Sequence, residues 1–196
     1  MIIQMLSFRA IGYRTLMLDF GAGRLPAANF PDWTQVATDG AGSTGLYQYA
    51  FDKTTDQSIF VNFHMPIEWA AGTTIYPHVH WAPATNGTQD QKVSWGMEYV
   101  ITEEGAVMGN STMIYGDTPE DWSAGDSLVA KQHYVTKIGS GIDMSASATG
   151  ATILVRFFRD ASGNGGTDDL DNDAYADELH VQYYSNTRAA AMDDYL

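Results

Sequence analysis

Two histidines separated by a single residue form the most distinctive chemical pattern in the chain. They are His78 and His80, in the segment GTTIYPHVH at residues 72–80. Because side chains alternate along a β-strand, the two imidazoles are expected on the same face of one strand. Neutral imidazoles placed in this way can bind a metal such as zinc, iron or manganese. Two ligands make an incomplete site, so further donors would have to come from elsewhere in the fold.

The spacing from the glycine to the two histidines is similar to that of the first metal-binding motif of the cupins. In that motif a glutamate follows the second histidine, whereas residues 81–86 read WAPATN here. The second cupin motif has no counterpart, and His133 and His180 are isolated on other predicted strands. We therefore expect no bound metal and no cofactor, and keep His78 and His80 as weak candidates.

A purely structural role is the favoured interpretation of this histidine pair. Pro77 precedes His78, and proline is tolerated in sheets mainly on edge strands, because it has no backbone N–H to donate. The sequence therefore predicts two half-exposed histidines on an edge strand, beside Tyr76 and Trp81.

The acidic run at residues 168–178 raises the question of calcium, which prefers several carboxylate oxygens on one loop. The spacing does not match an EF-hand. Counted from Asp169, the sixth position is Ala174 instead of glycine and the twelfth is His180 instead of glutamate. A solvated acidic loop is the favoured interpretation, with a loose calcium site left open.

Catalysis by other means has little support in the sequence. Glu68, Glu98 and Glu178 lie on or near predicted strands, and any two of them could meet in a groove as a glycosidase pair. Nothing in the sequence pairs them, however, and there is no cysteine nucleophile or G-x-S-x-G motif. We expect that the protein is not an enzyme.

Composition restricts the partners of the chain. The net charge is −14, with only 10 lysines and arginines, which opposes binding to phosphate backbones or anionic membranes. The absence of cysteine excludes disulfides and thiolate metal sites. No apolar stretch approaches the roughly 20 residues of a membrane-spanning helix. We expect a soluble protein that binds neither nucleic acid nor membrane.

Side-chain alternation predicts that the chain is all-β. In residues 92–101, for example, Val93, Trp95, Met97 and Tyr99 alternate with polar or small residues. About eight strands are predicted: 46–51, 58–65, 74–82, 92–101, 112–115, 127–138, 152–159 and 177–185. Eight antiparallel strands without intervening helices favour an antiparallel β-sandwich of jelly-roll type.

The N-terminal segment differs from the rest, because it concentrates arginine and is interrupted by glycine and proline. We divide the chain into an irregular N-terminal arm or edge segment (1–43), a jelly-roll β-sandwich (44–187) and a C-terminal tail (188–196) with a short helix near Ala189. The apolar side chains of the arm need cover from the body or from a neighbouring subunit. The interface residues that we predict are Arg9, Arg14, Leu16, Leu18, Phe20 and Arg24.

Three segments, GTTIYPHVHWAP (72–83), VSWGMEY (93–99) and LVRFFRD (154–160), resemble a family of bacteriophage virion structural proteins in their order and spacing. The resemblance covers most of residues 45–186. It implies a virion component. The size, the compact β body and the distinct N-terminal segment are similar to those of capsid decoration (cement) proteins.

This resemblance implies a set of partners and a location. A decoration protein made in the host cytoplasm would lie on the capsid surface of the virion. It would contact the major capsid protein and copies of itself, as a homotrimer more than as a dimer. The alternatives are a tail-associated or fibre domain that binds host glycans and, third, a cupin-like metalloenzyme.

Overall fold

The computed structural model describes residues 11–186. Arg9, the C-terminal tail and its expected helix near Ala189 lie outside the described residues. No helix in the described part of the chain has the length and apolar character needed to cross a membrane.

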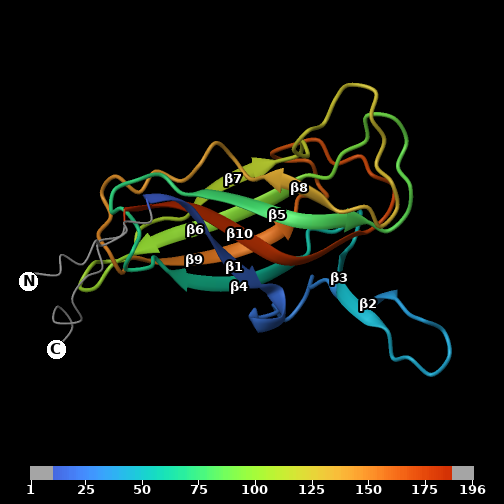
Figure 1. Ribbon diagram of the computed structural model, residues 1–196, viewed down its shortest axis with the longest axis horizontal. Coiled ribbons are helices and arrows are strands. Elements are labelled where there is room, and N and C mark those ends of the chain that lie inside the picture. Colours follow the sequence, from blue (N-terminus) through green and yellow to red (C-terminus); the bar gives the residue numbers. More distant parts are fainter. Residues whose placement is uncertain (1–10, 187–196) are drawn as a thin grey trace, which may run out of the picture.

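The described chain contains ten strands and one short 3-10 helix (Figure 1). The elements are β1 (Ile11–Asp19), η1 (Phe20–Ala22), β2 (Asp32–Ala37), β3 (Leu46–Phe51), β4 (Ser58–His64), β5 (Tyr76–Pro83), β6 (Trp95–Thr102), β7 (Thr112–Gly116), β8 (Tyr134–Lys137), β9 (Thr152–Arg159) and β10 (Ala174–Asn186).

The strands form two antiparallel sheets that pack face to face. The six-stranded sheet has the order β2-β3-β10-β5-β8, and β1 also pairs with β10. The four-stranded sheet has the order β4-β9-β6-β7. Strands β3-β10-β5-β8 opposite β4-β9-β6-β7 are the two four-stranded sheets of a jelly roll. The predicted sandwich is therefore confirmed, and β1 and β2 extend one sheet beyond the eight predicted strands.

The N-terminal segment is more regular than expected, so its description as irregular was wrong for residues 11–19. Strand β1 pairs without interruption with β10, from Ile11 opposite Asn186 to Asp19 opposite Glu178. The glycines and prolines that suggested irregularity follow β1 and form the turns that lead to β2. They separate two strands instead of preventing them.

Large aromatic side chains fill the space between the two sheets. Trp95 from β6 stacks on Phe157 from β9, with ring centroids 5.2 Å apart. Trp81 and Phe51, from the six-stranded sheet, meet Trp95 at 5.9 and 5.3 Å. All four are at most 2% exposed. A buried side chain of this kind contributes about 1.5–3 kcal/mol to folding, so this cluster is a main source of stability.

The acidic segment is partly built into the core, which corrects the expectation of a solvated loop. The carboxylate of Asp168 is buried and accepts two hydrogen bonds from Arg159, at 2.7 and 2.9 Å. It also accepts one from the backbone N–H of Ser94. Asp169 accepts a hydrogen bond from the backbone N–H of Lys92. These carboxylates hold the loop against the end of the sandwich.

Two details of strand pairing determine which side chains lie on the outer face of the six-stranded sheet. Strand β5 lies between β10 and β8, so the expectation of an edge strand was wrong. Pro77 is accommodated where the pairing with β8 ends: its carbonyl accepts from Ile138, and the regular register begins at His78. Strand β8 is also shorter than the predicted strand 127–138.

The second detail is a register shift in β10 between Ala176 and Glu178. Before the shift, Ala174 and Ala176 face the core, and after it Leu179 and Val181 do. The irregularity thus reverses which residues point inward. Glu178 and His180 are placed on the outer face of the sheet as a result.

Candidate functional site

Four of the five histidines in the chain gather on the outer face of the six-stranded sheet. His78 and His80 come from β5, His180 comes from β10, and His133 immediately precedes β8. The intervening Val79 is fully buried in the core between the sheets. The pair therefore points away from the sandwich interior, as alternation requires.

The register of β5 and β10 sets four side chains in a two-by-two arrangement. His78 lies directly opposite His180, and His80 lies directly opposite Glu178. The ring centroids of His80 and His180 are 3.9 Å apart, and those of His78 and His180 are 5.2 Å apart. Ligand atoms of the three histidines all lie within 4.8 Å of one another. Among the residues that the structure describes, this is the group of side chains suited to hold a metal ion.

The hydrogen bonds of this cluster are incomplete. His80 Nδ1 and His133 Nε2 are 2.8 Å apart and share one hydrogen bond. His180 Nε2 is 2.9 Å from Glu178 Oε1 but makes no hydrogen bond with it. The Nε2 atoms of both His80 and His180 are buried without a hydrogen-bond partner. A buried polar atom without a partner is uncommon in folded proteins and calls for an explanation.

Burial favours the uncharged form of two of these imidazoles. Loss of hydration lowers the pKa of His78, and the neighbouring His180 lowers it further. Burial, followed by the nearby His180, His133 and His78, lowers the pKa of His80 to about 4. Neutral imidazole is the form that binds metals.

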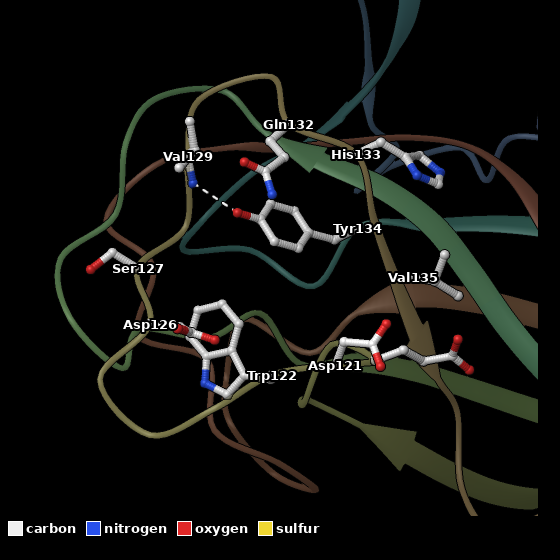
Figure 2. A pocket seen from close by; sticks show the side chains of 10 residues that line it. Asp121, Trp122, Asp126, Ser127, Val129, Gln132, His133, Tyr134 and Val135 are labelled. Carbon is white, nitrogen blue, oxygen red and sulfur yellow. Dashed lines mark hydrogen bonds between the residues drawn. The ribbon is translucent and has the colours of Figure 1, made fainter.

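A polar pocket of about 460 Å³ adjoins the cluster through His133 (Figure 2). Trp122 and Tyr134 line it, and the Tyr134 hydroxyl accepts a hydrogen bond from the backbone N–H of Val129. Figure 2 shows the His133 ring at the edge of the pocket, directed away from Trp122. The remaining lining is largely acidic or polar, with Glu120, Asp121, Asp126, Ser127 and Gln132.

A second candidate surface is the hairpin of β2 and β3, which projects from the sandwich (Figure 1). Trp33 lies opposite Tyr49, on the same side of the sheet as the buried Phe51. Trp33 stacks with Tyr47 and is 57% exposed, and Tyr47 is 39% exposed. The inner, apolar face of the six-stranded sheet therefore continues onto the hairpin, where these rings reach solvent.

The predicted interface residues fall into three groups: apolar side chains covered by the core, arginines that contact the body of the protein, and one residue outside the described range. Phe20 has no exposed surface and stacks on Phe157, with ring centroids 4.6 Å apart. Leu16 and Leu18 pack against the same core, so the body of the protein supplies their cover. Arg14 lies 3.8 Å from Glu68. Arg24 makes two backbone hydrogen bonds with Phe60. Arg9 lies outside the described residues.

The carboxylates considered for glycoside hydrolysis do not come together. Glu98 lies on the four-stranded sheet, where it accepts hydrogen bonds from Arg156 and Ser111. These bonds lower the pKa of Glu98, with that from Ser111 as the largest cause. Glu178 lies on the other sheet, and Glu68 accepts a hydrogen bond from Tyr183. Each of the three has a different set of partners.

A groove of about 860 Å³ also crosses the outer face of the four-stranded sheet, next to Glu98. Strand β1 and the turn that follows it contribute Met17, Ala22 and Arg24 to the lining. Strands β4, β6 and β9 contribute most of the remainder, so the groove lies where the N-terminal segment meets the four-stranded sheet.

His78 and His80 were predicted as a pair from the sequence, whereas His133, His180 and Glu178 were expected to lie apart from them. Alternation along the predicted strand 177–185 puts Glu178 and His180 on one face, and the structure confirms this. The missing information was that β10 pairs with β5, and no local pattern in either segment encodes that pairing.

Comparison with known proteins leaves the family open. No family model matches the chain, and no curated protein matches it. Among solved structures, the chain is similar to one in the structure of infectious bursal disease virus, Gx strain, at 11% sequence identity and a TM-score of 0.30. The likeness covers 81% of this chain and 39% of the viral one. At this level it assigns neither a family nor a function, so the resemblance to phage virion proteins stays a prediction.

Proposed function

We propose that the protein is a structural component of a bacteriophage virion, specifically a capsid decoration protein that contacts the major capsid protein and copies of itself. The observation that carries this proposal is the exposed aromatic face of the β2–β3 hairpin. Trp33 and Tyr47 continue a core face of the sandwich into solvent. An apolar face of this kind gains burial energy when a neighbouring subunit covers it.

The neighbour that we propose for the hairpin is a second copy of this chain, in a homotrimer. Strand β2 forms the edge of the six-stranded sheet and pairs only with β3 among the strands of the described chain. An open edge strand beside exposed aromatic rings favours self-association. Tryptophan and tyrosine are also the side chains that most often dominate binding energy at protein interfaces.

The exposed residues of β1 and of the β2–β3 hairpin change the set of interface residues that we propose. Phe20 is already covered by the core, so it has no area to offer a partner. Tyr13 and Met17 lie on the same strand, β1, and are 64% and 69% exposed. In the proposal, the exposed side of β1 contacts the shell and the hairpin contacts the adjacent copy. The acidic body faces outward.

Light scattering coupled to gel filtration tests the self-association. The wild-type protein is expected at three times the mass of the 21.4 kDa chain. The Trp33→Ala/Tyr47→Ala variant is expected at the monomer mass, because truncating an aromatic hot-spot residue at the centre of an interface costs about 2 kcal/mol or more. Circular dichroism verifies that the variant is folded.

The matched control is Val107→Ala, since Val107 is 96% exposed in the loop between β6 and β7. It removes exposed apolar area away from the hairpin and should leave the trimer intact. A wild-type protein that remains monomeric at high concentration contradicts the trimer.

The position in the virion is tested by copy number. Densitometry of purified particles is expected to show hundreds of copies per virion, as a shell protein requires. A handful of copies would indicate a tail component instead.

The second candidate, a tail-associated or fibre domain that binds glycans, is favoured by one observation. The rings of Trp33 and Tyr47 are stacked, with centroids 6.0 Å apart and an interplanar angle of 16°. Exposed aromatic faces of this kind suit the apolar faces of sugar rings. Binding of the monomeric protein to a glycan array, lost in Trp33→Ala, would favour this candidate over the decoration role.

A further inference from the structure

We propose that His78, His80, His180 and Glu178 form a binding site for a divalent transition metal, zinc in the first instance, on the outer face of the six-stranded sheet. The site goes beyond the proposed virion role and does not depend on it. Three imidazoles and one carboxylate form a ligand set that suits zinc and related ions.

The register of β5 and β10 brings the four side chains together. His78 opposite His180 and His80 opposite Glu178 are two directly paired positions, two residues apart on each strand. In such an arrangement all four side chains leave the sheet on one face with their Cβ atoms close together. Strands β5 and β10 are central in the sheet, with partners on both sides, so the backbone beneath the site is held firmly.

Two buried ring nitrogens of the cluster lack hydrogen bonds. His80 Nε2 and His180 Nε2 are buried and make no hydrogen bond, although His180 Nε2 lies 2.9 Å from Glu178 Oε1. The rings that carry them are 3.9 Å apart. Burying a polar nitrogen without a hydrogen bond costs free energy. A cation bound between the two nitrogens would satisfy both of them.

The orientation of His80 suits metal binding through its Nε2 atom. When His80 Nδ1–H donates to His133 Nε2, across their 2.8 Å separation, the lone pair of His80 Nε2 is free. Metal-binding histidines usually donate their second ring N–H to a neighbouring group, which fixes the tautomer and the ring orientation. We assign His133 this supporting role and do not count it among the ligands.

The distances are compatible with coordination after small side-chain rotations. Zinc–nitrogen bonds of about 2.0–2.1 Å in a tetrahedron place the ligand atoms about 3.3 Å apart. The ligand atoms of the three histidines lie within 4.8 Å of one another. Glu178 lies outside this group of three, and its Oε1 is 2.9 Å from His180 Nε2, so its carboxylate would have to turn toward His78 and His80 to become the fourth ligand. A metal held by all four side chains would tie β5 to β10.

The test is zinc binding by untagged, chelator-treated protein, measured by isothermal titration calorimetry and by elemental analysis after dialysis. We expect one zinc per chain and a rise in the melting temperature. Cobalt, used as a spectroscopic probe, should give the absorption of a tetrahedral nitrogen- and oxygen-ligated ion. Calcium should not bind at this site, because imidazole ligands suit transition metals.

Variants distinguish this site from adventitious binding. His80→Asn and His180→Asn should each weaken zinc binding by more than the roughly 10–100-fold expected when a supporting residue is lost, and His133→Asn should fall within that range. The matched control is His64→Asn, because His64 lies on the four-stranded sheet and contacts Thr152. Its zinc affinity should equal that of the wild type.

Two results would overturn the proposal. One is the absence of stoichiometric zinc binding by the wild-type protein. The other is a His80→Asn/His180→Asn double variant, folded by circular dichroism, that binds zinc as tightly as the wild type. If the double variant does not fold, nitrogen NMR of the wild-type histidine rings replaces it. Zinc should then shift the Nε2 resonances of His80 and His180, and unchanged resonances would also overturn the site.

Discussion

The guanidinium of Arg159 and the carboxylate of Asp168 form a completely buried ion pair at the end of the sandwich, with side-chain exposures of 0% and 1%. The guanidinium also donates to the backbone carbonyls of Phe51, Asn172 and Leu170. The pair thereby joins β9, β3 and the acidic loop. A buried charge is tolerated here because its hydrogen-bonding groups have partners.

Replacing Arg159 with methionine should therefore destabilise the protein strongly. Asp168 would be left buried without its partner, and breaking such a pair costs about 3–5 kcal/mol of unfolding free energy. Urea denaturation followed by tryptophan fluorescence measures the change. The Arg159→Met/Asp168→Leu double variant should recover part of the loss, because no unpaired charge then remains. A double variant that is less stable than either single variant would contradict this account.

Phe20 should behave as a core residue even though it lies in the N-terminal segment. Phe20→Ala leaves a cavity against Phe157 and should lower the unfolding free energy by about 3–5 kcal/mol. Met17→Ala, on the exposed side of β1, should change it by less than about 0.5 kcal/mol. Equal effects of the two substitutions would show that the segment is not integrated in the fold.

Gly96 allows an aromatic ring to lie on the backbone of β6. It is paired with Phe158 across the sheet, and a methyl group at this position would overlap the Phe158 ring. We expect Gly96→Ala to lower the unfolding free energy by about 1–3 kcal/mol, since the ring must move. Gly109→Ala is the control, because space around Gly109 is open. Thermal denaturation of the two variants provides the comparison.

Stability at alkaline pH should depend on Tyr183. Its hydroxyl donates a 2.9 Å hydrogen bond to Glu68, and burial, aided by that carboxylate, raises its pKa to about 12. Because the pKa of Tyr183 is higher in the folded state, the protonated hydroxyl contributes to folding stability. This contribution is complete below the pKa of the unfolded chain, about 10, and is lost as the pH rises through about 12. The unfolding free energy of the wild type should therefore decrease as the pH is raised from about 10 to about 12.

Tyr183→Phe should remove this part of the pH dependence. At neutral pH it should lower the unfolding free energy by about 1–3 kcal/mol, because Glu68 loses a donor. Urea midpoints measured at several alkaline pH values compare the two proteins. Glu68→Gln keeps an acceptor without the charge, so its unfolding free energy should decrease less at alkaline pH than that of the wild type. Parallel curves for the wild type and Tyr183→Phe would rule out the assigned role of Tyr183.

Much of the architecture follows from local patterns. Alternation predicted the bounds of β3 and β9 as the structure has them, because long runs of alternating residues are compatible only with a strand covered on one face. It failed for β1, where Leu16, Leu18 and Phe20 alternate in the same way but precede a segment rich in turn residues. It also overestimated β8, because Lys131 has a positive φ of 60° and interrupts the predicted strand.

The sequence by itself determined that His78 and His80 share a face, and that Glu178 and His180 share another, since a strand has a period of two. Only the tertiary structure decided that both pairs lie on the same face of one sheet. The pairing of β5 with β10 joins residues about 100 positions apart, and it depends on how all the strands share one core. The register shift before Glu178 then aligned the two pairs, which no periodicity within either strand specifies.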